Sequence, residues 1–444
     1  MGSAQSCQLD QVSNLCDMHQ CISKVQGKAS NSASPTDTWL CTLKPNTTFN
    51  GQPCSHTFMK IGINNATKAA AALTFECLVY DRLIVPILDA QMCPHFLRSY
   101  LVSTSCTYSD LEKTLRAGLS DLDDRQRAIN LHRNLTYMEK KEKRRPAIQK
   151  ITPRQAFVPK IASHLVPNFF MHHRFIVIST EYSQVQTYRD WVSREHLSSA
   201  ERFSVLLQIL IALQVMSFVK LMHNDLHTSN ILIRQHPPQV MTYIIHGLDR
   251  PVSILTTHTA LVFDFDHATC KALGVNKGMS QDRQQFQDKR DLVCFYKNVT
   301  RNVRKQDMPQ VCLDDLNALF RTRPFTLAEI ERWSVGDGND IEPSIAAGIQ
   351  SIAEMLEKTL PPIEAPFGPK ANVYYATPKM LLPNGNFNRS SADHILLDKC
   401  MDEKSVFRNL QISPEETRHF SKKRRMEDAS TQSPNKTNTK TMSQ

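Results

Sequence analysis

The longest apolar run of the chain, from Phe203 to Met222, is the feature that most limits what the protein can fold into. A run of this length could cross a membrane, but serine and glutamine residues interrupt it and Lys220 lies near its end. The four residues directly before it, Ser198 to Glu201, have the pattern of a capping box, which begins a helix. Because a helix that is apolar on nearly every side belongs in the interior of a large domain, we expect a buried central helix and no transmembrane span.

The 444 residues divide by pattern into a β-rich first part and a mainly helical second part. Short apolar and β-branched runs separated by polar turns favour strands between residues 21 and 63, and a helix follows at 64–87. The pattern predicts an α+β fold with a small β-rich lobe and a larger, mainly helical lobe. The predicted segments are a flexible arm at 1–20, a first lobe at 21–182 with a charged helical insertion at about 107–160, a second lobe at 183–412, and a disordered basic tail at 413–444.

Individual elements follow from the same periodicities. Strands are expected at Cys21–Val25, Trp39–Leu43, Thr57–Ile61 and Phe175–Ile178, and two short ones at Ile231–Ile233 and Leu261–Phe263 on either side of a turn-rich segment. Beyond the central helix, helices are expected at 288–305, 313–321 and 345–359, and a loop at 360–395.

Charge and glycine content exclude several kinds of binding site. The chain has 53 Lys and Arg against 43 Asp and Glu, and the net charge of +10 is a modest attraction for phosphates. Its basic runs contain no interleaved aromatic residues, so we expect no stable nucleic-acid binding. The chain has only 13 glycines, and neither G-x-G-x-x-G nor G-x-x-x-x-G-K-[ST] occurs. Any nucleotide site therefore uses unusually little glycine.

Cysteine usage and two short motifs bear on location. The twelve cysteines form no C-x-x-C pair, and the N-terminus is too polar for a signal peptide. We therefore expect reduced thiols in a cytoplasmic or nuclear protein. Residues Met1–Ser6 fit the N-myristoylation pattern at Gly2, and Lys422–Arg425 fits a nuclear-import signal.

The residues suited to chemistry come directly after the apolar run, in the stretch His223-Asn224-Asp225-Leu226-His227-Thr228-Ser229-Asn230. Asp225 in a loop can accept a proton from a hydroxyl nucleophile, and Asn230 can reach a magnesium ion that bridges phosphates. A second motif, Val262–Asp266, places Asp264 at the end of a buried strand. Because Mg²⁺ prefers oxygen ligands, the carboxylate of Asp264 could ligate the same ion, and the three residues predict one phosphoryl-transfer site.

These two motifs resemble the protein-kinase-like superfamily, whose catalytic loop reads H-R-D-L-x-x-x-N and whose metal-binding triplet reads D-F-G. Upstream, Lys60 ends a predicted strand where that family has V-A-I-K, and Glu76 stands where a helix supplies the partner of that lysine. Downstream, Asp291 is similar to the aspartate that braces the catalytic loop. The likeness is greatest to the divergent serine/threonine kinase-like proteins of large DNA viruses, which share the HNDLH-type loop and the D-F-D triplet.

The resemblance implies a bilobal protein-kinase-like fold, ATP and Mg²⁺ as cofactors, and phosphoryl transfer to Ser or Thr hydroxyls of a protein substrate that the sequence does not name. It assigns catalysis to Asp225, Lys60 and Glu76, metal binding to Asn230 and Asp264, and nucleotide binding to Gly27, Lys60, Glu181 and Tyr182.

The chain departs from the family at positions that bear on nucleotide binding and activation. Gly27 stands without the other glycines of the family's phosphate-covering loop, and Phe58 replaces a small alanine that lies against adenine. By strand alternation, Phe58 shares a face with Lys60. Asn224 replaces an arginine that pairs with a phosphorylated activation segment in many kinases. We therefore expect activity that needs no such phosphate.

Two other functions fit parts of the sequence. A small-molecule phosphotransferase resembling the aminoglycoside and choline kinases would explain His227 and Asp266, which match their H-x-D-L-H and D-F-[DE] patterns. The C-terminal half is not markedly acidic, which argues against a cationic substrate. A pseudokinase or scaffold would fit the sparse glycines and Phe58, but all five catalytic-type residues are present.

Overall fold

The computed structural model describes residues 7–378 apart from 13, 29–36, 50, 65–66, 118–173, 183–184, 195–196, 288, 320–343 and 360–371. Gly2, the larger part of the predicted insertion at 107–160, and the predicted tail at 413–444 with Lys422–Arg425 lie outside the described residues. At the start of that insertion, α4 (Tyr108–Ala117) is helical.

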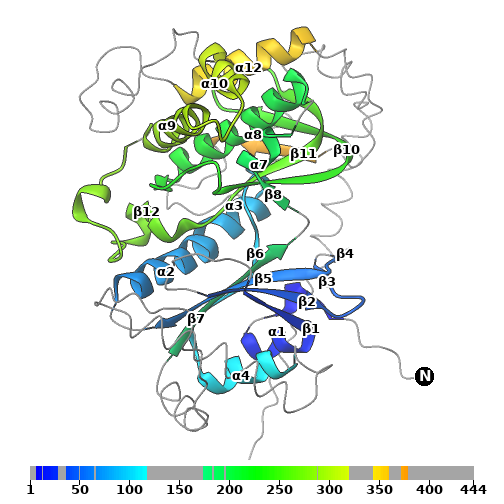
Figure 1. The fold of residues 1–444 in the computed structure, drawn as a ribbon, viewed down its shortest axis with the longest axis vertical. Helices are drawn as coiled ribbons and strands as arrows, with labels where there is room; N and C mark the ends of the chain where they lie inside the picture. The colour runs from blue at the N-terminus through cyan, green and yellow to red at the C-terminus, as the bar shows by residue number, and fades with distance from the viewer. Residues whose placement is uncertain are drawn as a thin grey trace, which may run out of the picture.

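A five-stranded antiparallel sheet forms the first part of the chain (Figure 1). Its strands are β1 (Ile22–Lys28), β2 (Asp37–Leu43), β5 (His56–Asn64), β7 (Arg174–Tyr182) and β6 (Ser99–Cys106), in that spatial order. The short strands β3 (Thr48–Phe49) and β4 (Gln52–Pro53) pair beside it. The predicted strands of this region are confirmed, and each continues beyond its apolar centre.

The central strand β5 shows why this region has two differently used faces. Met59 and Ile61 are fully buried in a core that also contains Trp39 and Leu111. The alternate residues Phe58 and Lys60 point to the other face and stay partly accessible, as strand alternation requires. Helices α1 (Leu15–Cys21) and α4 cover the first face and α2 (Lys68–Val79) the second (Figure 1).

The N-terminal residues differ from the irregular arm expected at 1–20. Leu9–Gln11 forms a 3-10 turn, and α1 begins where the side chain of Asn14 accepts a hydrogen bond from the Asp17 amide at 3.0 Å. Leu15 and Met18 are buried against the sheet. The arm prediction is wrong here because these two apolar residues, spaced for one helix face, pack in the core.

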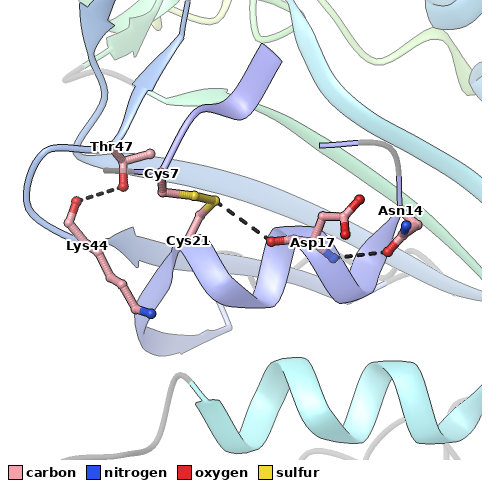
Figure 2. The surroundings of a disulfide bond; sticks show 6 residues. All are labelled: Cys7, Asn14, Asp17, Cys21, Lys44 and Thr47. Carbon is pink, nitrogen blue, oxygen red and sulfur yellow. Dashed lines mark hydrogen bonds between the residues drawn. A yellow bond between two sulfur atoms is a disulfide. The ribbon is translucent and has the colours of Figure 1, made fainter. Parts of the chain in front are cut away.

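A disulfide joins Cys7 to Cys21 (Figure 2). The expectation that every cysteine is a reduced thiol is therefore wrong for this pair. Buried thiols elsewhere stay protonated, since burial raises the pKa of Cys41 and of Cys312 to about 12.

One continuous helical rod follows β5, close to the predicted 64–87. It consists of α2, a π-helical turn at Tyr80–Ile84, and α3 (Val85–Asp89). Thr67 caps it by accepting a hydrogen bond from the Ala70 amide at 3.2 Å. Residues of this rod join the largest core of the molecule, which also contains the central helix.

The central helix is α8 (Ser199–Phe218), and Ser198 and Glu201 form the predicted capping box. It is the one helix among the described residues that is long and apolar enough to span a membrane, yet 78% of its apolar window is buried inside the protein. The buried-helix prediction is confirmed. The helices around it are α7 (Tyr188–Val192), α9 (Arg290–Arg304), α10 (Gln310–Leu319) and α12 (Ile345–Thr359).

The region between Asn230 and Asp264 differs from the two short strands expected there. It is a long antiparallel hairpin of β10 (Ile231–Ile245) and β11 (Val252–Val262). The pairing is interrupted only between Gln235 and Gln239, where the sequence has two prolines. The accessible middle of β10, residues 234–240, is polar and contains the two prolines, so the sequence pattern did not show that the strand continues through it to the buried residues 241–245.

Two further strands complete the hairpin sheet. β8 (Val185–Thr187) pairs antiparallel with the start of β10, and β13 (Asn372–Ala376) pairs parallel with its end. The loop expected at 360–395 is therefore wrong at β13. The short elements around the site are β9 (Leu221–Met222), β12 (Thr269–Cys270) and the 3-10 turns Phe265–His267, Lys271–Leu273 and Gln281–Arg283.

The architecture is thus a mixed α+β fold, with a sheet-rich first part and a helix-rich second part (Figure 1). It agrees with the predicted kinase-like fold. The division into two lobes and its boundaries at 21–182 and 183–412 remain predictions.

A buried glutamine on α8 ties this helix to the hairpin and gives a test of the packing. Gln208 donates to the His258 carbonyl at 2.9 Å and accepts from the Ala260 amide at 2.8 Å. We expect Gln208→Leu to lower the free energy of unfolding by about 1–3 kcal/mol, because the buried Ala260 amide loses its side-chain partner, while Thr256 still donates to the His258 carbonyl at 2.8 Å. Chemical denaturation measures this loss.

Ser204 on the same helix is the matched control. It is buried, and its Oγ has no hydrogen-bond partner among the described residues. Ser204→Ala should therefore change the free energy of unfolding by no more than about 0.5 kcal/mol. Equal losses in the two variants would show that the hydrogen bonds of Gln208 do not anchor the hairpin.

Candidate active site

Lys60 is the meeting point of three elements of the fold. Its Nζ lies 2.7 Å from Oε2 of Glu76 on α2 and 2.6 Å from Oδ1 of Asp264, which follows β11. Oδ2 of Asp266 lies 3.8 Å from the same nitrogen. The lysine side chain is only 18% exposed, so these ion pairs are shielded from water and geometrically specific.

The central residue of the D-F-D triplet, Phe265, is held by both its backbone and its side chain. The Phe265 amide donates to Oε1 of Glu76 at 3.2 Å. The Phe265 ring is fully buried and meets Tyr80 edge-on, with ring centroids 5.7 Å apart. Asp264 itself has a left-handed backbone, with φ 68° and ψ 64°. This turn aims the Asp264 carboxylate at Lys60 instead of along the strand.

Three carboxylates surround one ammonium group here, so the cluster carries an excess of negative charge. Burial raises the pKa of Glu76, and the charges of Asp264 and Asp266 add to this against the opposing effect of Lys60, bringing it to about 7. Burial also raises the pKa of Asp266. For Asp264, burial is outweighed by the charge and hydrogen bond of Lys60, and its pKa falls. Such a cluster attracts a cation.

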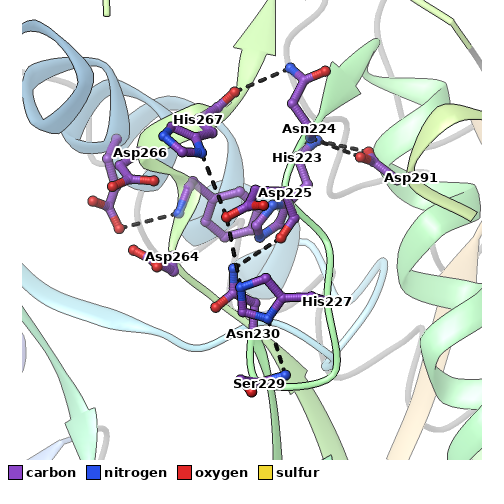
Figure 3. Close-up of polar contacts among 12 residues, drawn as sticks. His223, Asn224, Asp225, His227, Ser229, Asn230, Asp264, Asp266, His267 and Asp291 are labelled. Atoms are coloured by element: carbon purple, nitrogen blue, oxygen red, sulfur yellow. Dashed lines mark hydrogen bonds and ion pairs between the residues drawn. The ribbon is translucent and has the colours of Figure 1, made fainter. Parts of the chain in front are cut away.

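The backbone at the start of the loop that contains Asp225 is held by Asp291 of α9. This buried carboxylate accepts hydrogen bonds from the backbone amides of His223 at 2.7 Å and Asn224 at 2.8 Å (Figure 3). His223 also places Nε2 2.8 Å from the Phe263 carbonyl. The loop is thereby tied to both α9 and the end of β11, which is the bracing that the resemblance implied for Asp291.

Asn224 stands where the kinase family has an arginine, and it binds the segment after β11 directly. Its backbone is left-handed, with φ 64°. Its Nδ2 donates to the His267 carbonyl at 3.1 Å and to Oγ1 of Thr269 at 2.9 Å. A neutral amide thus makes the connection for which an arginine would need a phosphate.

Asp225 lies at the accessible end of the site, with 45% of its side chain exposed. Two imidazoles face its Oδ2: Nε2 of His227 at 3.7 Å and Nδ1 of His267 at 3.6 Å (Figure 3). Burial alone would raise the pKa of Asp225, but the contact with His267 and the charges of the histidines outweigh it, and the pKa is lowered. Asp225 is therefore an ionised carboxylate at neutral pH.

Asn230 and Asp264 stand at the ends of two paired strands. Ile231 of β10 pairs with Val262 of β11, and the Phe263 amide donates to the Asn230 carbonyl at 3.2 Å. The Asn230 side chain donates Nδ2 to the Asp225 carbonyl at 3.0 Å, which leaves its amide oxygen as the atom that can bind a cation.

These groups fit a magnesium ion that a nucleotide brings with it. Among the described residues, no three His, Cys, Asp or Glu side chains are grouped as a metal site. Mg²⁺ is commonly held by one or two carboxylates with phosphate oxygens and water completing its shell. One carboxylate, one amide oxygen and surplus negative charge meet that need.

The residues predicted to bind the nucleotide do not all have side chains free for this purpose. Gly27 lies near the end of β1, at the register shift between Gln26 and Lys28. The carboxylate of Glu181 accepts from the Arg98 amide at 3.0 Å and pairs with Arg234 at 2.8 Å. If Glu181 contacts a nucleotide, it would therefore do so through its backbone and not through its carboxylate.

Aromatic side chains line the neighbouring stretch of β5 and β7. Phe58 meets Tyr182 edge-on, with ring centroids 4.7 Å apart, and His56 lies 5.7 Å from the same ring. Phe58 is on the Lys60 face of β5. The base of a nucleotide bound at Lys60 would therefore meet aromatic surface where the family has alanine.

The sequence motifs missed the residues that hold α2 against the D-F-D segment. A Cβ on Gly278 would lie 2.6 Å from Cβ of Ala72 and 2.8 Å from the Lys68 carbonyl. Ala72 precedes Glu76 by four residues and so shares its helix face. Only glycine lets the segment approach the helix this closely. No sequence pattern singled out this glycine.

Gly278 is in turn positioned by Asn276, which is fully buried. The Asn276 Nδ2 donates to the carbonyls of Asp266 at 3.1 Å and Ala268 at 2.7 Å, and its Oδ1 accepts from the Gly278 amide at 2.9 Å. No recognised motif contains this asparagine.

Comparisons with known proteins add little to this geometry. No protein-family model and no curated protein match the chain. Among solved structures, that of WaaP in complex with acyl carrier protein is similar, with 15% identity, a TM-score of 0.28, and coverage of 77% of this chain and 92% of that one. This distant similarity concerns the fold and carries no argument about activity or ligands.

Replacing Gly278 tests whether the segment after β11 holds α2 in place. Gly278→Ala inserts a methyl group where helix atoms already lie, so α2 must shift. We expect amide hydrogen exchange over 68–79 to become roughly tenfold faster, a loss of about 1.4 kcal/mol of local stability. Hydrogen-exchange mass spectrometry measures it.

Gly247→Ala is the control for glycine replacement in general. Gly247 has a φ of +88° but nothing within 4 Å of its Cβ position. It should therefore destabilise its own turn and leave α2 unchanged. Unaltered exchange of α2 in Gly278→Ala would contradict the proposed contact.

Proposed function

We propose that the protein is an ATP- and Mg²⁺-dependent phosphotransferase whose acceptor is a Ser or Thr hydroxyl of a protein. The observation that carries this proposal is Lys60, held by Glu76 and Asp264 at 2.7 and 2.6 Å, in the same site as an ionised Asp225. A phosphate-binding cation, a metal-type carboxylate and a base are thereby brought together from four separate parts of the chain.

Each side chain has a definite task in such a reaction. Lys60 would bind phosphate oxygens, and Glu76 would keep its ammonium group in place. Asn230 and Asp264 would hold Mg²⁺, and bound Mg·ATP supplies the transferable phosphoryl group together with neutralisation of its charge. Asp225 would orient the acceptor hydroxyl and take its proton.

The accessibility of Asp225 supports a macromolecular acceptor. With 45% of its side chain exposed, this carboxylate can be reached by a hydroxyl that projects from another protein. Phosphoryl acceptors that are small molecules are usually enclosed by their site.

Transfer to a small-molecule acceptor is the second candidate function. Of the two residues that favour it in the sequence, His227 and Asp266, only His227 lies beside Asp225. His227 lies beside Asp225, where it could contact an acceptor. Asp266, in contrast, faces Lys60 at 3.8 Å. Its likeness to the D-F-[DE] pattern therefore concerns the nucleotide end and not the choice of acceptor.

Substitution of Asp225 tests the proposed chemistry. The purified protein is incubated with γ-labelled ATP and Mg²⁺, alone and with casein or histone. We expect label on protein, and we expect Asp225→Asn to lower the rate at least about 100-fold, because the amide cannot accept the proton.

Asp314→Asn is the matched control, since Asp314 is exposed on α10 and far from this chemistry. Its rate should equal that of the wild type. Transfer that survives in Asp225→Asn would exclude this residue as the base. Nucleotide binding with no transfer by the wild type would point to a pseudokinase.

A further inference from the structure

His267 lies in the segment after β11, outside every motif that identified the site, yet it reaches the proposed base. Its Nδ1 is 3.6 Å from Oδ2 of Asp225 (Figure 3). The ring comes from the 3-10 turn Phe265–His267, whereas Asp225 belongs to the loop after α8. The contact therefore joins two separately held parts of the site.

The backbone at His267 is held by contacts of this residue and of a neighbour in the chain. The His267 carbonyl accepts from the Asn224 side chain at 3.1 Å, and Phe265, two residues earlier, is fully buried. The backbone that carries the ring is thus held in place, while the side chain itself is 44% exposed.

The Nδ1 atom of His267 is buried and has no hydrogen-bond partner within 3.5 Å among the described residues. Asp225 is the acceptor that it faces. A buried donor without a partner costs free energy, and hydrogen bonds of catalytic groups are often long before a substrate binds and shorten afterwards. A small closure of the site would complete this bond.

The second imidazole facing the same oxygen is held in a different way. His227 accepts from the Ser229 amide at Nδ1, with a distance of 3.2 Å. A neutral ring that accepts at Nδ1 carries its proton on Nε2, which is the nitrogen facing Asp225. Both imidazoles thus face Oδ2, and within the part of the chain that the structure describes, no side chain pairs with the other carboxylate oxygen of Asp225.

We infer that His267 is a positioning residue for the proposed transfer: it holds Oδ2 of Asp225, so that the other carboxylate oxygen is presented to the acceptor hydroxyl. This inference rests on the proposed role of Asp225 as the base. In consequence, the base is correctly oriented only when the segment after β11, which carries His267, is in place.

The charges around His267 agree with this role. The contact with Asp225 raises the pKa of His267 above its usual 6.5, burial opposes this, and Asp266 and Asp264 on its own segment add to the increase. Across the site, His227 lies beside Asp225, and Lys60 on β5 is the cationic group that pairs with Asp264. The imidazolium form therefore persists to higher pH than it does in an ordinary histidine.

Histidine titration by NMR tests the contact without any need for activity. The imidazole signal of His267 is assigned by its loss in His267→Gln. We expect its pKa to lie above 6.5 in the wild type and to fall in Asp225→Asn, while exposed His246 serves as a reference that does not move. An equal His267 pKa in both proteins would overturn the inference.

Kinetics test whether the contact serves the reaction. We expect His267→Gln to lower kcat about tenfold with the KM for ATP within twofold, because a misplaced base slows the transfer without touching the nucleotide. The wild-type kcat should fall as pH rises through the measured His267 pKa, since the ring then loses its charge, and the variant should lack this limb. Thermal unfolding checks that the variant is folded, and His246→Gln should match the wild type throughout.

The possible results separate this inference from the proposed function. An unchanged kcat and an unchanged pH profile in His267→Gln would overturn the positioning role while transfer itself remains established. If the wild type transferred no phosphate, the proposed function would fail, and the positioning role with it, whatever the titration showed.

Discussion

The ion cluster at Lys60 is the interaction on which the arrangement of this molecule depends. One partly buried ammonium group contacts carboxylates from α2 and from the turn after β11, while the lysine itself belongs to the middle of the sheet. Removing one partner of a buried ion pair leaves an uncompensated charge, which typically costs about 3–5 kcal/mol. The sheet, α2 and the hairpin are therefore held in one relative position by charge as well as by packing.

The polar contacts that surround this cluster extend the same constraint to the base. Asp291 holds the backbone before Asp225, Asn224 holds the backbone after β11, and Asn276 holds that segment where it meets α2. In these links, backbone amides donate hydrogen bonds to the Asp291 carboxylate, and the side-chain amides of Asn224 and Asn276 donate to backbone carbonyls. All of these links are made by groups of the chain itself.

Much of the fold and the central residues of the site were predictable, because they depend on local patterns. Strand alternation around Lys60 and the apolar run of α8 are visible in any short window, and the spacing of Asp225, Asn230 and Asp264 follows from their shared chemistry. The middle of β10 is polar and contains two prolines, so periodicity did not show that one strand runs through it. Strand β13 depends on a partner more than a hundred residues away.

Other features could not be predicted, since they arise only from three-dimensional neighbours. The carboxylate of Glu181 is occupied by Arg234, and nothing near residue 181 in the sequence indicates this. Gly278 and His267 stand in no motif, and their importance depends on which helix or carboxylate lies opposite them. Sequence motifs indicated Asp291 and Glu76 as groups that hold others in place, but they gave no sign of Gly278 or His267.

A site with three carboxylates around a single lysine should bind a nucleotide through a cation. Titration calorimetry of ATP against the purified protein, with Mg²⁺ and then with a chelator in its place, tests it most directly. We predict at least about tenfold tighter binding with Mg²⁺, because phosphate alone is repelled by the surplus negative charge. Equal affinity with and without Mg²⁺, or no binding of ATP in either condition, would contradict the account.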